Sequence, residues 1–233
     1  MPKLLTVLIA AGVGLVATTA VAAAQTNPYS GTGYDISYPQ CSSASLPTGS
    51  FGIVGVNKGR PFTANPCFSQ ELAHASGGVM PAPSIYINTA YSGAYRRNVT
   101  PNCAQQAQSM AWQIGCSEAE TAYGYAGQPA TGTVTAWWLD VETGNSWSSS
   151  NVSLNQAAIN GAADFLFQKG FQVGVYSTPS MWATITGRTT VFTPTNTVAA
   201  WVAGANGGCT SSFDANPLWL SQYTSGFDFD NAC

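Results

Sequence analysis

Trp137-Trp138-Leu139-Asp140-Val141-Glu142 is an apolar run that carries two carboxylates two positions apart. Apolar side chains at successive positions are typical of a strand that is buried on both faces. Since side chains of a strand alternate between its faces, we expect Asp140 and Glu142 to point the same way. Charged residues make up only 7% of the chain, so two neighbouring like charges indicate a function, with acid–base catalysis as the first candidate.

Other strands are predicted along the chain, and helices fall between several of them. The expected strands are 33–37, 51–57, 84–88, 135–142, 171–177, 197–203, 218–223 and a short one at 227–230. The expected helices are 68–76, 103–125, 154–169, which has the strongest pattern, and 179–185. Strands that alternate with helices predict a parallel sheet and an α/β fold.

Polar side chains stand where these strands end. In parallel α/β folds, above all in the (β/α) barrel, functional groups collect at the carboxyl ends of the strands. The side chains at these ends are Asp35, Asn57, Asn88, Asp140, Glu142, Tyr176, Ser177, Gln222, Tyr223, Asp228 and Asp230. Half of the ten acidic residues are among them, which predicts one acidic pocket at one mouth of an apolar barrel.

The N-terminus has the pattern of a secretory signal. A lysine at position 3 precedes an almost wholly apolar run over residues 4–21, and three alanines occupy positions 22–24. We expect cleavage after Ala24, which leaves a single domain over residues 25–233 and a secreted, extracellular or cell-wall protein. A membrane anchor is the alternative.

The charge of the predicted mature chain argues against polyanionic partners. Without Lys3, six basic residues stand against ten acidic ones, a net charge of −4. The chain as a whole therefore lacks the electrostatic footprint of a protein that binds nucleic acid or anionic lipid. We expect no nucleic acid partner, no membrane contact after cleavage, and a monomer.

Six cysteines follow the predicted signal, and an even count in an exported chain favours three disulfides. Fifteen pairings of six cysteines are possible, and the nearest-neighbour pairing is our expectation. It joins Cys41 with Cys67, Cys103 with Cys116, and Cys209 with Cys233. No C-x-x-C occurs and His74 is the only histidine, so we expect no zinc site and no cofactor.

Five short motifs occur in one order along almost the whole predicted mature chain. They are GYDIS at 33–37, WLDVE at 138–142, GVYST at 174–178 with Trp182, AWVA at 200–203, and QYTS at 222–225 with FD at 227–228. Together they resemble the family 25 glycoside hydrolases, the lysozymes of the Chalaropsis type. The resemblance implies an irregular, TIM-like (β/α) barrel of about eight strands with fewer helices, here stapled by disulfides.

The same resemblance implies cleavage of the β-1,4 bond between N-acetylmuramic acid and N-acetylglucosamine in peptidoglycan. Glu142 would be the general acid that protonates the leaving oxygen. Asp140 would be its partner carboxylate, which either stabilises an oxocarbenium-like transition state or orients the 2-acetamido group. Asp35 would complete the catalytic set. An ionised Asp140 nearby would raise the pKa of Glu142, as the acid role requires.

Other side chains are candidates for contact with the sugar. They are Asp228, Asp230, Asn57, Asn88, Trp147, Tyr176, Gln222 and Tyr223. Trp147, in the loop just after the acid pair, is the best candidate for stacking on a sugar face, whereas Trp137 and Trp138 are expected in the core. Alternatively, Asp228 and Asp230 are turn residues or ligands of a calcium ion.

Two other classes of function stay open. The predicted second and third strands end in Asn57-Lys58 and Asn88-Thr89, and the cysteine framework is not general in the family, which indicates a divergent, exported branch. A carbohydrate-binding barrel without turnover is the first alternative. A metal-dependent hydrolase that uses the acids as Mg²⁺ or Ca²⁺ ligands is the second, weakened by the single histidine.

Overall fold

The computed structural model describes residues 26–77, 81–188, 191–192, 198–204, 206–209, 212–213 and 216–233. The predicted signal and its cleavage site lie outside these residues, as does the start of the strand expected at 197–203. None of the helices in the described ranges has the length and apolar character needed to cross a bilayer.

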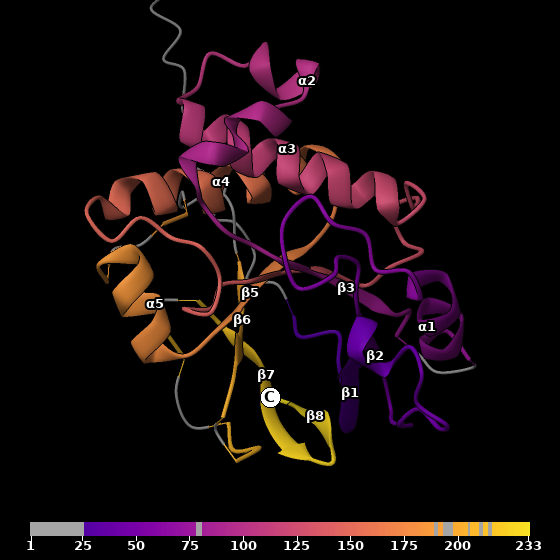
Figure 1. Cartoon of the computed structure of the whole chain (residues 1–233). Helices are drawn as coiled ribbons and strands as arrows, with labels where there is room; N and C mark the ends of the chain where they lie inside the picture. The colour runs from indigo at the N-terminus through magenta and orange to yellow at the C-terminus, as the bar shows by residue number, and fades with distance from the viewer. Residues whose placement is uncertain are drawn as a thin grey trace, which may run out of the picture.

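Eight strands close into one barrel in chain order (Figure 1). They are β1 (Thr32–Ile36), β2 (Gly52–Gly55), β3 (Ser84–Asn88), β4 (Trp137–Asp140), β5 (Val173–Ser177), β6 (Ala199–Val202), β7 (Leu218–Ser225) and β8 (Phe227–Ala232). The expected TIM-like α/β barrel is confirmed. The strands β1 to β7 run parallel to one another.

The last strand departs from the expected parallel sheet. β8 pairs antiparallel with both β7 and β1. A parallel return would need a crossover of a dozen or more residues, but Gly226 alone separates β7 from β8. Gly226 has a φ of 78°, the left-handed region that glycine tolerates best, so the chain reverses there in a tight hairpin.

Helices cover the barrel on the side of its middle strands. They are α1 (Phe68–Ala75), α2 (Pro101–Ala104), α3 (Met110–Tyr125), α4 (Val152–Gln168) and α5 (Pro179–Thr186), with short 3₁₀ turns η1 (Tyr38–Gln40) and η2 (Gly93–Asn98). In Figure 1, α3 and α4 lie together across the upper part of the molecule, with α1 and α5 on opposite flanks. The β7–β8 hairpin lies at the other end of this view.

The long helix expected at 103–125 is two helices in the structure, so that prediction was wrong. The Ser109 hydroxyl accepts a hydrogen bond from the backbone N–H of Trp112 at 3.3 Å and thereby caps a new N-terminus. Thr100 caps the short α2 in the same way through the N–H of Cys103, at 3.4 Å. Side-chain caps of this kind separate two helices within one continuous Ala- and Gln-rich pattern.

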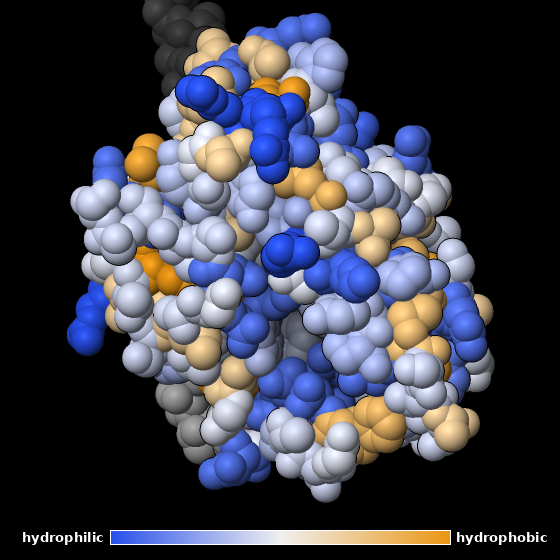
Figure 2. Space-filling view, in the orientation of Figure 1, coloured by the Kyte–Doolittle hydropathy of each residue, from blue (hydrophilic) through white to orange (hydrophobic). Residues whose placement is uncertain are grey.

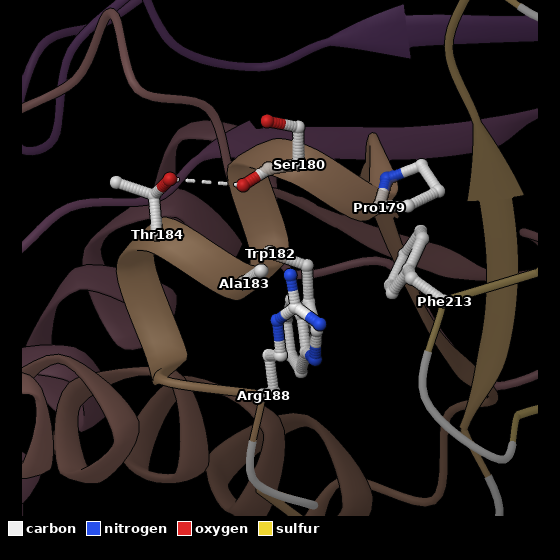
Figure 3. Close-up of a pocket in the computed structure, with 7 residues that line it drawn as sticks. All are labelled: Pro179, Ser180, Trp182, Ala183, Thr184, Arg188 and Phe213. Atoms are coloured by element: carbon white, nitrogen blue, oxygen red, sulfur yellow. Dashed lines mark hydrogen bonds between the residues drawn. The ribbon is translucent and has the colours of Figure 1, made fainter.

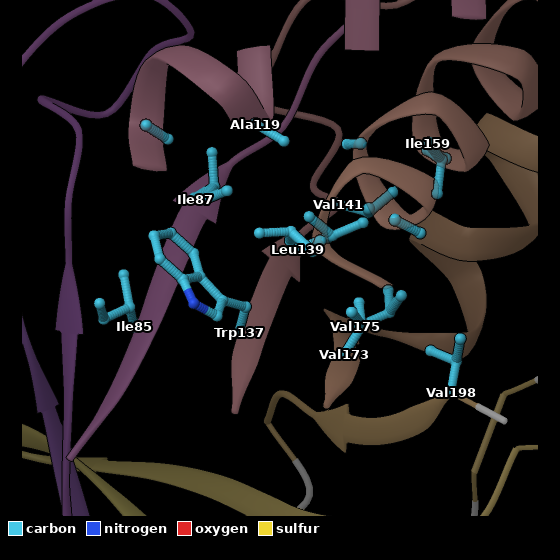
Figure 4. Packing of buried hydrophobic residues seen from close by; sticks show 14 of the residues in the cluster. Ile85, Ile87, Ala119, Trp137, Leu139, Val141, Ile159, Val173, Val175 and Val198 are labelled. Atoms are coloured by element: carbon cyan, nitrogen blue, oxygen red, sulfur yellow. The ribbon is translucent and has the colours of Figure 1, made fainter. Parts of the chain in front are cut away.

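The strand β4 is buried on both faces, as its sequence predicts. Trp137 and Leu139 face outward and pack with strands β3 and β5 and with helices α3 and α4, from which Ala119 and Ile159 contribute (Figure 4). Trp138 and Asp140 face into the barrel. The same strand therefore carries the outer core on one side and the acid pair on the other.

Aromatic side chains fill the barrel below the acids. The ring centroid of Trp138 lies 5.6 Å from that of Trp201 and 6.3 Å from that of Trp219. The Trp138 indole donates a hydrogen bond to the Tyr29 hydroxyl at 3.0 Å. Gly174 leaves room for this indole, since a Cβ at that position would lie 2.2 Å from the Trp138 ring. A plugged interior restricts any pocket to the mouth of the barrel.

Three disulfides join Cys41 with Cys67, Cys103 with Cys116, and Cys209 with Cys233. They are the nearest-neighbour pairs. Each bond closes a loop and stabilises the fold mainly by restricting the unfolded chain. The last of them ties the C-terminus to the segment between β6 and β7.

Candidate active site

A pocket of about 150 Å³ opens at the carboxyl ends of the parallel strands. Its lining residues are Asp35, Tyr86, Asn88, Asp140, Glu142, Tyr176, Trp201, Gln222 and Asp228. The molecular surface is hollowed near the middle of the face shown in Figure 2, and mainly hydrophilic residues surround this hollow. Acids far apart in the sequence thus meet at one mouth of the barrel.

Strand register brings these side chains to one level. Asp140 is paired with Asn88 of β3 on one side and with Tyr176 of β5 on the other. Asp35 of β1 is paired with Asp228 of β8. Because side chains alternate along each strand, residues in register all face the interior when one of them does. Glu142 follows Asp140 by two positions and lies one step closer to solvent.

A chain of hydrogen bonds fixes Asp35. The Tyr176 hydroxyl donates to Gln222 Oε1 at 2.7 Å, and Gln222 Nε2 donates to Asp35 Oδ2 at 2.8 Å. The tyrosine bond determines which end of the Gln222 amide faces Asp35. Gln222 and Tyr176 therefore position a carboxyl group and also line the pocket.

Asn88 supports Asp140 by donating a hydrogen bond from Nδ2 to Asp140 Oδ2. Behind it, Asn57 exchanges two bonds with the Asn88 backbone, at 3.0 Å to N and 3.1 Å to O. Asn57 is only 2% exposed and does not line the pocket. It was predicted to contact substrate, but the structure places it where it acts on the site through Asn88.

Two hydrogen bonds hold the backbone of Glu142 in place. Its carbonyl oxygen accepts hydrogen bonds from Trp147 Nε1 at 2.7 Å and from the N–H of Asn145 at 3.1 Å. Its carboxyl group is half-buried in the pocket wall. A carboxyl group that lines a pocket on a fixed backbone is suited to meet a substrate oxygen.

In the described part of the chain, no Lys, Arg or His lines the pocket to neutralise its acids. Burial, followed by the charge of Asp228, raises the pKa of Glu142. Burial, then the charges of Glu142 and Asp35, raises the pKa of Asp140 well above its ordinary range. The cluster therefore retains protons at pH values where exposed carboxyls have lost them.

Asp230 lies under the pocket. It is fully buried, and Oδ1 accepts a hydrogen bond from Trp201 Nε1 at 2.8 Å. Burial, with the charge of Asp35, raises its pKa well above the ordinary range. Asp230 was predicted to bind substrate, but it is absent from the pocket lining and forms part of the supporting layer.

We predict that Asp35→Asn stabilises the protein at alkaline pH. Burial and the charge of Asp228 raise the pKa of Asp35 to about 7, against about 4 in an unfolded chain. Between these values the native state binds more protons than the unfolded state, so stability falls as pH rises through this window. The variant should gain up to about 4 kcal/mol in unfolding free energy at pH 8 and little at pH 4. Urea titrations from pH 4 to 8 test this; an unchanged pH slope contradicts it.

Two further predicted contacts, besides Asn57 and Asp230, lie outside this pocket. Trp147 lines an adjoining depression of about 520 Å³, together with Tyr91, Ser92, Gly93, Asn145, Ser146 and Ser148. Tyr223 follows Gln222 on β7 and points the other way, where it stacks on Phe229 with ring centroids 5.8 Å apart. The alternation of the strand explains why neighbours in one motif separate.

Tyr86 and Trp201 line the pocket but were not among the predicted site residues. Tyr86 precedes Asn88 by two positions, and the period of two could have placed it on the same face. Trp201 lies in the AWVA motif, and its ring packs edge-on against Tyr176 with centroids 4.5 Å apart. Both side chains add apolar surface to the otherwise polar lining of the pocket.

A larger depression of about 660 Å³ lies over α5 (Figure 3). Trp182, Arg188 and Phe213 are among its lining residues. Among the residues that the structure describes, its lining contains no carboxylate, and Arg188 is the only charged side chain in it. The chemistry of the acid pair is therefore confined to the smaller pocket.

Comparison with known proteins places the chain in a family. The family model described as Lysozyme-like protein 1 matches residues 87–223, which include the strands β4 and β5 and the acid pair. No curated protein matches the sequence.

Solved structures share the fold at low identity. A family 25 glycosyl hydrolase from Bacillus anthracis superposes with a TM-score of 0.60 at 13% identity, over 89% of this chain and 91% of that one. A muramidase from Acremonium alcalophilum gives 0.60 at 16% identity, over 87% and 93%. The modular autolysin LytC from Streptococcus pneumoniae, solved with a synthetic peptidoglycan ligand, gives 0.53 at 16%, over 86% of this chain and 45% of that one.

These likenesses establish a barrel like that of the family 25 glycoside hydrolases. The family model covers more than half of the chain, including Asp140 and Glu142. The chain belongs to the family described as Lysozyme-like protein 1.

Proposed function

We propose that this protein hydrolyses β-1,4 glycosidic bonds of peptidoglycan, with Glu142 as the general acid. The observation that carries the proposal is the convergence of Asp35, Asp140, Glu142 and Asp228 on one pocket without a neutralising cation. Glycoside hydrolysis needs two carboxyl groups beside the scissile bond, one of them protonated. The family and the fold of the peptidoglycan-bound autolysin support the choice of polymer.

Glu142 has the properties that the acid role requires. Burial and the charge of Asp228 raise its pKa, so that its proton is retained closer to neutral pH. Protonation of the glycosidic oxygen by Glu142 lets the leaving sugar depart as a neutral alcohol. Its fixed main chain limits the movement of the carboxyl group during this transfer.

The remaining acids surround the developing positive charge. An oxocarbenium-like transition state carries positive charge on the sugar ring, which nearby ionised carboxylates stabilise. Burial raises the pKa of Asp140 and of Asp35, and the positive charge on the sugar opposes that shift and favours their ionised forms. Asp140, oriented by Asn88, is the partner of Glu142 and either meets this charge or holds the 2-acetamido group. Asp35, oriented by Gln222, supports the same sugar from the opposite side of the barrel mouth.

The proposed site of action is outside the cell. Three disulfides are typical of proteins that mature in an oxidising compartment. The N-terminal pattern of a secretory signal supports the same conclusion.

Digestion of purified peptidoglycan tests the proposal. We expect soluble fragments whose new reducing ends are N-acetylmuramic acid, at a rate that EDTA does not change. Reducing ends of N-acetylglucosamine would contradict the proposed bond. Loss of activity in EDTA would favour a metal-dependent hydrolase, and co-sedimentation without fragments would favour a carbohydrate-binding barrel.

A further inference from the structure

Four exposed cations gather on two loops at the mouth of the barrel. Lys58 and Arg60 lie on the loop after β2, and Arg96 and Arg97 lie in η2 after β3. We call these four residues the basic rim. They make up four of the six basic residues that follow the predicted signal. The chain as a whole has a negative net charge, so the total charge does not reveal this local excess of positive charge.

Acidic residues are scarce around the basic rim. Between Asp35 and Glu118 the sequence contains a single acidic residue, Glu71. Glu71 is 1% exposed and accepts a hydrogen bond from Asn65 Nδ2 at 2.7 Å. Its carboxyl group therefore lies inside the fold and does not pair with the exposed cations. The helix α3, which packs against η2, adds Glu118 and Glu120. Glu118 is buried, and Glu120 accepts hydrogen bonds from Thr100 and Asn102. Cations therefore outnumber exposed acids on the two loops.

Direct contacts hold the two loops side by side. The rings of Phe62 and Tyr95 pack edge-on with centroids 5.4 Å apart and join the two loops. The Tyr125 hydroxyl donates to the Phe62 carbonyl at 3.4 Å and ties the first loop to α3. Within the first loop, Thr63 Oγ1 accepts from the N–H of Lys58 at 3.1 Å and donates to the carbonyl of Arg60 at 2.6 Å. The backbone that carries these cations is thus fixed in place.

The loops that carry the basic rim follow strands at the mouth of the barrel, where the acidic pocket opens. Lys58 follows Asn57, which bonds the backbone of the pocket residue Asn88. On the other side, the depression beside Trp147 reaches Gly93, where η2 begins. A polymer seated at Glu142 would therefore have the basic rim beside it. Figure 2 shows strongly hydrophilic residues directly above the hollow.

We propose that the basic rim binds the carboxylates of the peptide stems on the polysaccharide whose sugar backbone enters the acidic pocket. This inference rests on the proposed function. The pocket repels anions, so the carboxylates of a substituted polymer must lie outside it, and the basic rim is the adjoining surface of opposite charge.

Binding of the stems at the basic rim would select which of the polymer's glycosidic bonds is cleaved. Peptide stems occur on alternate sugars of the polymer, and two kinds of β-1,4 bond alternate along it. A stem held at the basic rim fixes which sugar lies on each side of Glu142. Charge at the basic rim therefore determines the register of cleavage as well as affinity.

Binding to sacculi free of phosphate polymers tests the inference, measured by co-sedimentation in a Glu142→Gln background that prevents digestion. The test variant is Arg96→Gln/Arg97→Gln. The matched control is Lys169→Gln/Arg188→Gln, which removes the same charge from exposed positions elsewhere. We expect the test variant to bind roughly tenfold more weakly at low salt, and the control less than twofold more weakly.

Amidation of the stem carboxyls, by carbodiimide and an amine, supplies the second arm. It should weaken the parent at least as much as the substitutions do. It should weaken the test variant less, because only Lys58 and Arg60 remain there to meet the carboxylates. Equal binding by parent and test variant, or equal sensitivity of both to amidation, would overturn the inference. A loss seen only on walls that carry phosphate polymers would assign the basic rim to phosphate and overturn it as well.

Digestion of the same sacculi by the protein with Glu142 intact separates the two proposals. If it releases no fragments, the proposed function fails while the binding comparison can still be read. If it releases fragments and the Arg96→Gln/Arg97→Gln protein matches it in rate, cleavage register and binding, only the basic rim fails. Lys58→Gln/Arg60→Gln repeats the test on the other loop if the first variant unfolds at the assay temperature.

Discussion

Glu142→Gln is expected to reduce peptidoglycan hydrolysis about 10³-fold. The glutamine side chain has nearly the same shape but cannot transfer a proton to the leaving oxygen. Binding should persist, because the main-chain bonds that hold residue 142 come from Trp147 and Asn145 and do not involve the carboxyl group. Fragment release and co-sedimentation on the same sacculi measure both quantities.

Glu120→Gln is the matched control for this result. Glu120 lies on α3, outside the pocket, and accepts hydrogen bonds from Thr100 and Asn102. The same chemical change there should leave hydrolysis within about twofold of the parent. If Glu142→Gln retains more than a tenth of the parental rate, another group supplies the proton.

The pH profile gives a second readout of the same role. A general acid acts in its protonated form, so activity should fall as pH rises through the pKa of Glu142. Burial and Asp228 raise that pKa, which moves the alkaline limb of the profile toward neutral pH. The residual activity of Glu142→Gln should lack this limb. A limb that survives the substitution would assign it to another carboxyl of the cluster.

Gly161→Ala is expected to destabilise the fold by about 3 kcal/mol, a fall of about 10 °C in Tm. The helices α3 and α4 touch through their backbones at two glycines. A Cβ on Gly161 would lie 2.0 Å from the Trp112 carbonyl oxygen, and one on Gly115 would lie 1.8 Å from the Ala158 carbonyl oxygen. Backbone atoms cannot rotate away as a flexible side chain can, so the helices must separate.

Gly124→Ala distinguishes this effect from helix propensity. Gly124 is exposed on α3, and a Cβ there would meet nothing within 4 Å. Alanine is the better helix former, so this variant should gain up to about 1 kcal/mol. Thermal unfolding of both variants with the disulfides intact gives the comparison. Equal Tm values for Gly161→Ala and the parent would contradict the close crossing.

The position of α4 also affects the candidate active site. Asn155 of α4 accepts a hydrogen bond from the N–H of Ser148 at 2.8 Å and donates to its carbonyl at 3.0 Å. This pair fixes the loop that carries Trp147, whose indole holds the Glu142 carbonyl. Displacement of α4 by Gly161→Ala should therefore lower hydrolysis below what the loss of folded protein explains.

The strands were predictable because their pattern is local. The expected strand at 84–88 coincides with β3, and those at 171–177 and 218–223 overlap β5 and β7 closely. The break between α2 and α3 was missed because a capping serine within a helical pattern has no unique signature. The reversal into β8 was missed because alternating strands and helices predict parallel neighbours, and the effect of one glycine depends on its backbone angle.

Depth inside the barrel, in addition to the face of the strand, separated the predicted site residues. Asp35, Asn88, Asp140, Glu142, Tyr176, Gln222 and Asp228 face the pocket together. Asp230 faces the interior too, but one layer deeper, and Asn57 supports Asn88 from behind. Depth inside a barrel depends on the stagger of all eight strands, which no single motif contains.

The sequence by itself determined the acid pair on one strand face and the double burial of β4, because both follow from a period of two in one short segment. It also indicated the barrel class, through the order of its motifs. Only the tertiary structure decided which acids meet, which lie beneath them, and that four cations lie on two neighbouring loops at the same mouth of the barrel. Closure of the barrel sets these distances, and closure depends on the register of every strand and on loops that bring distant residues together.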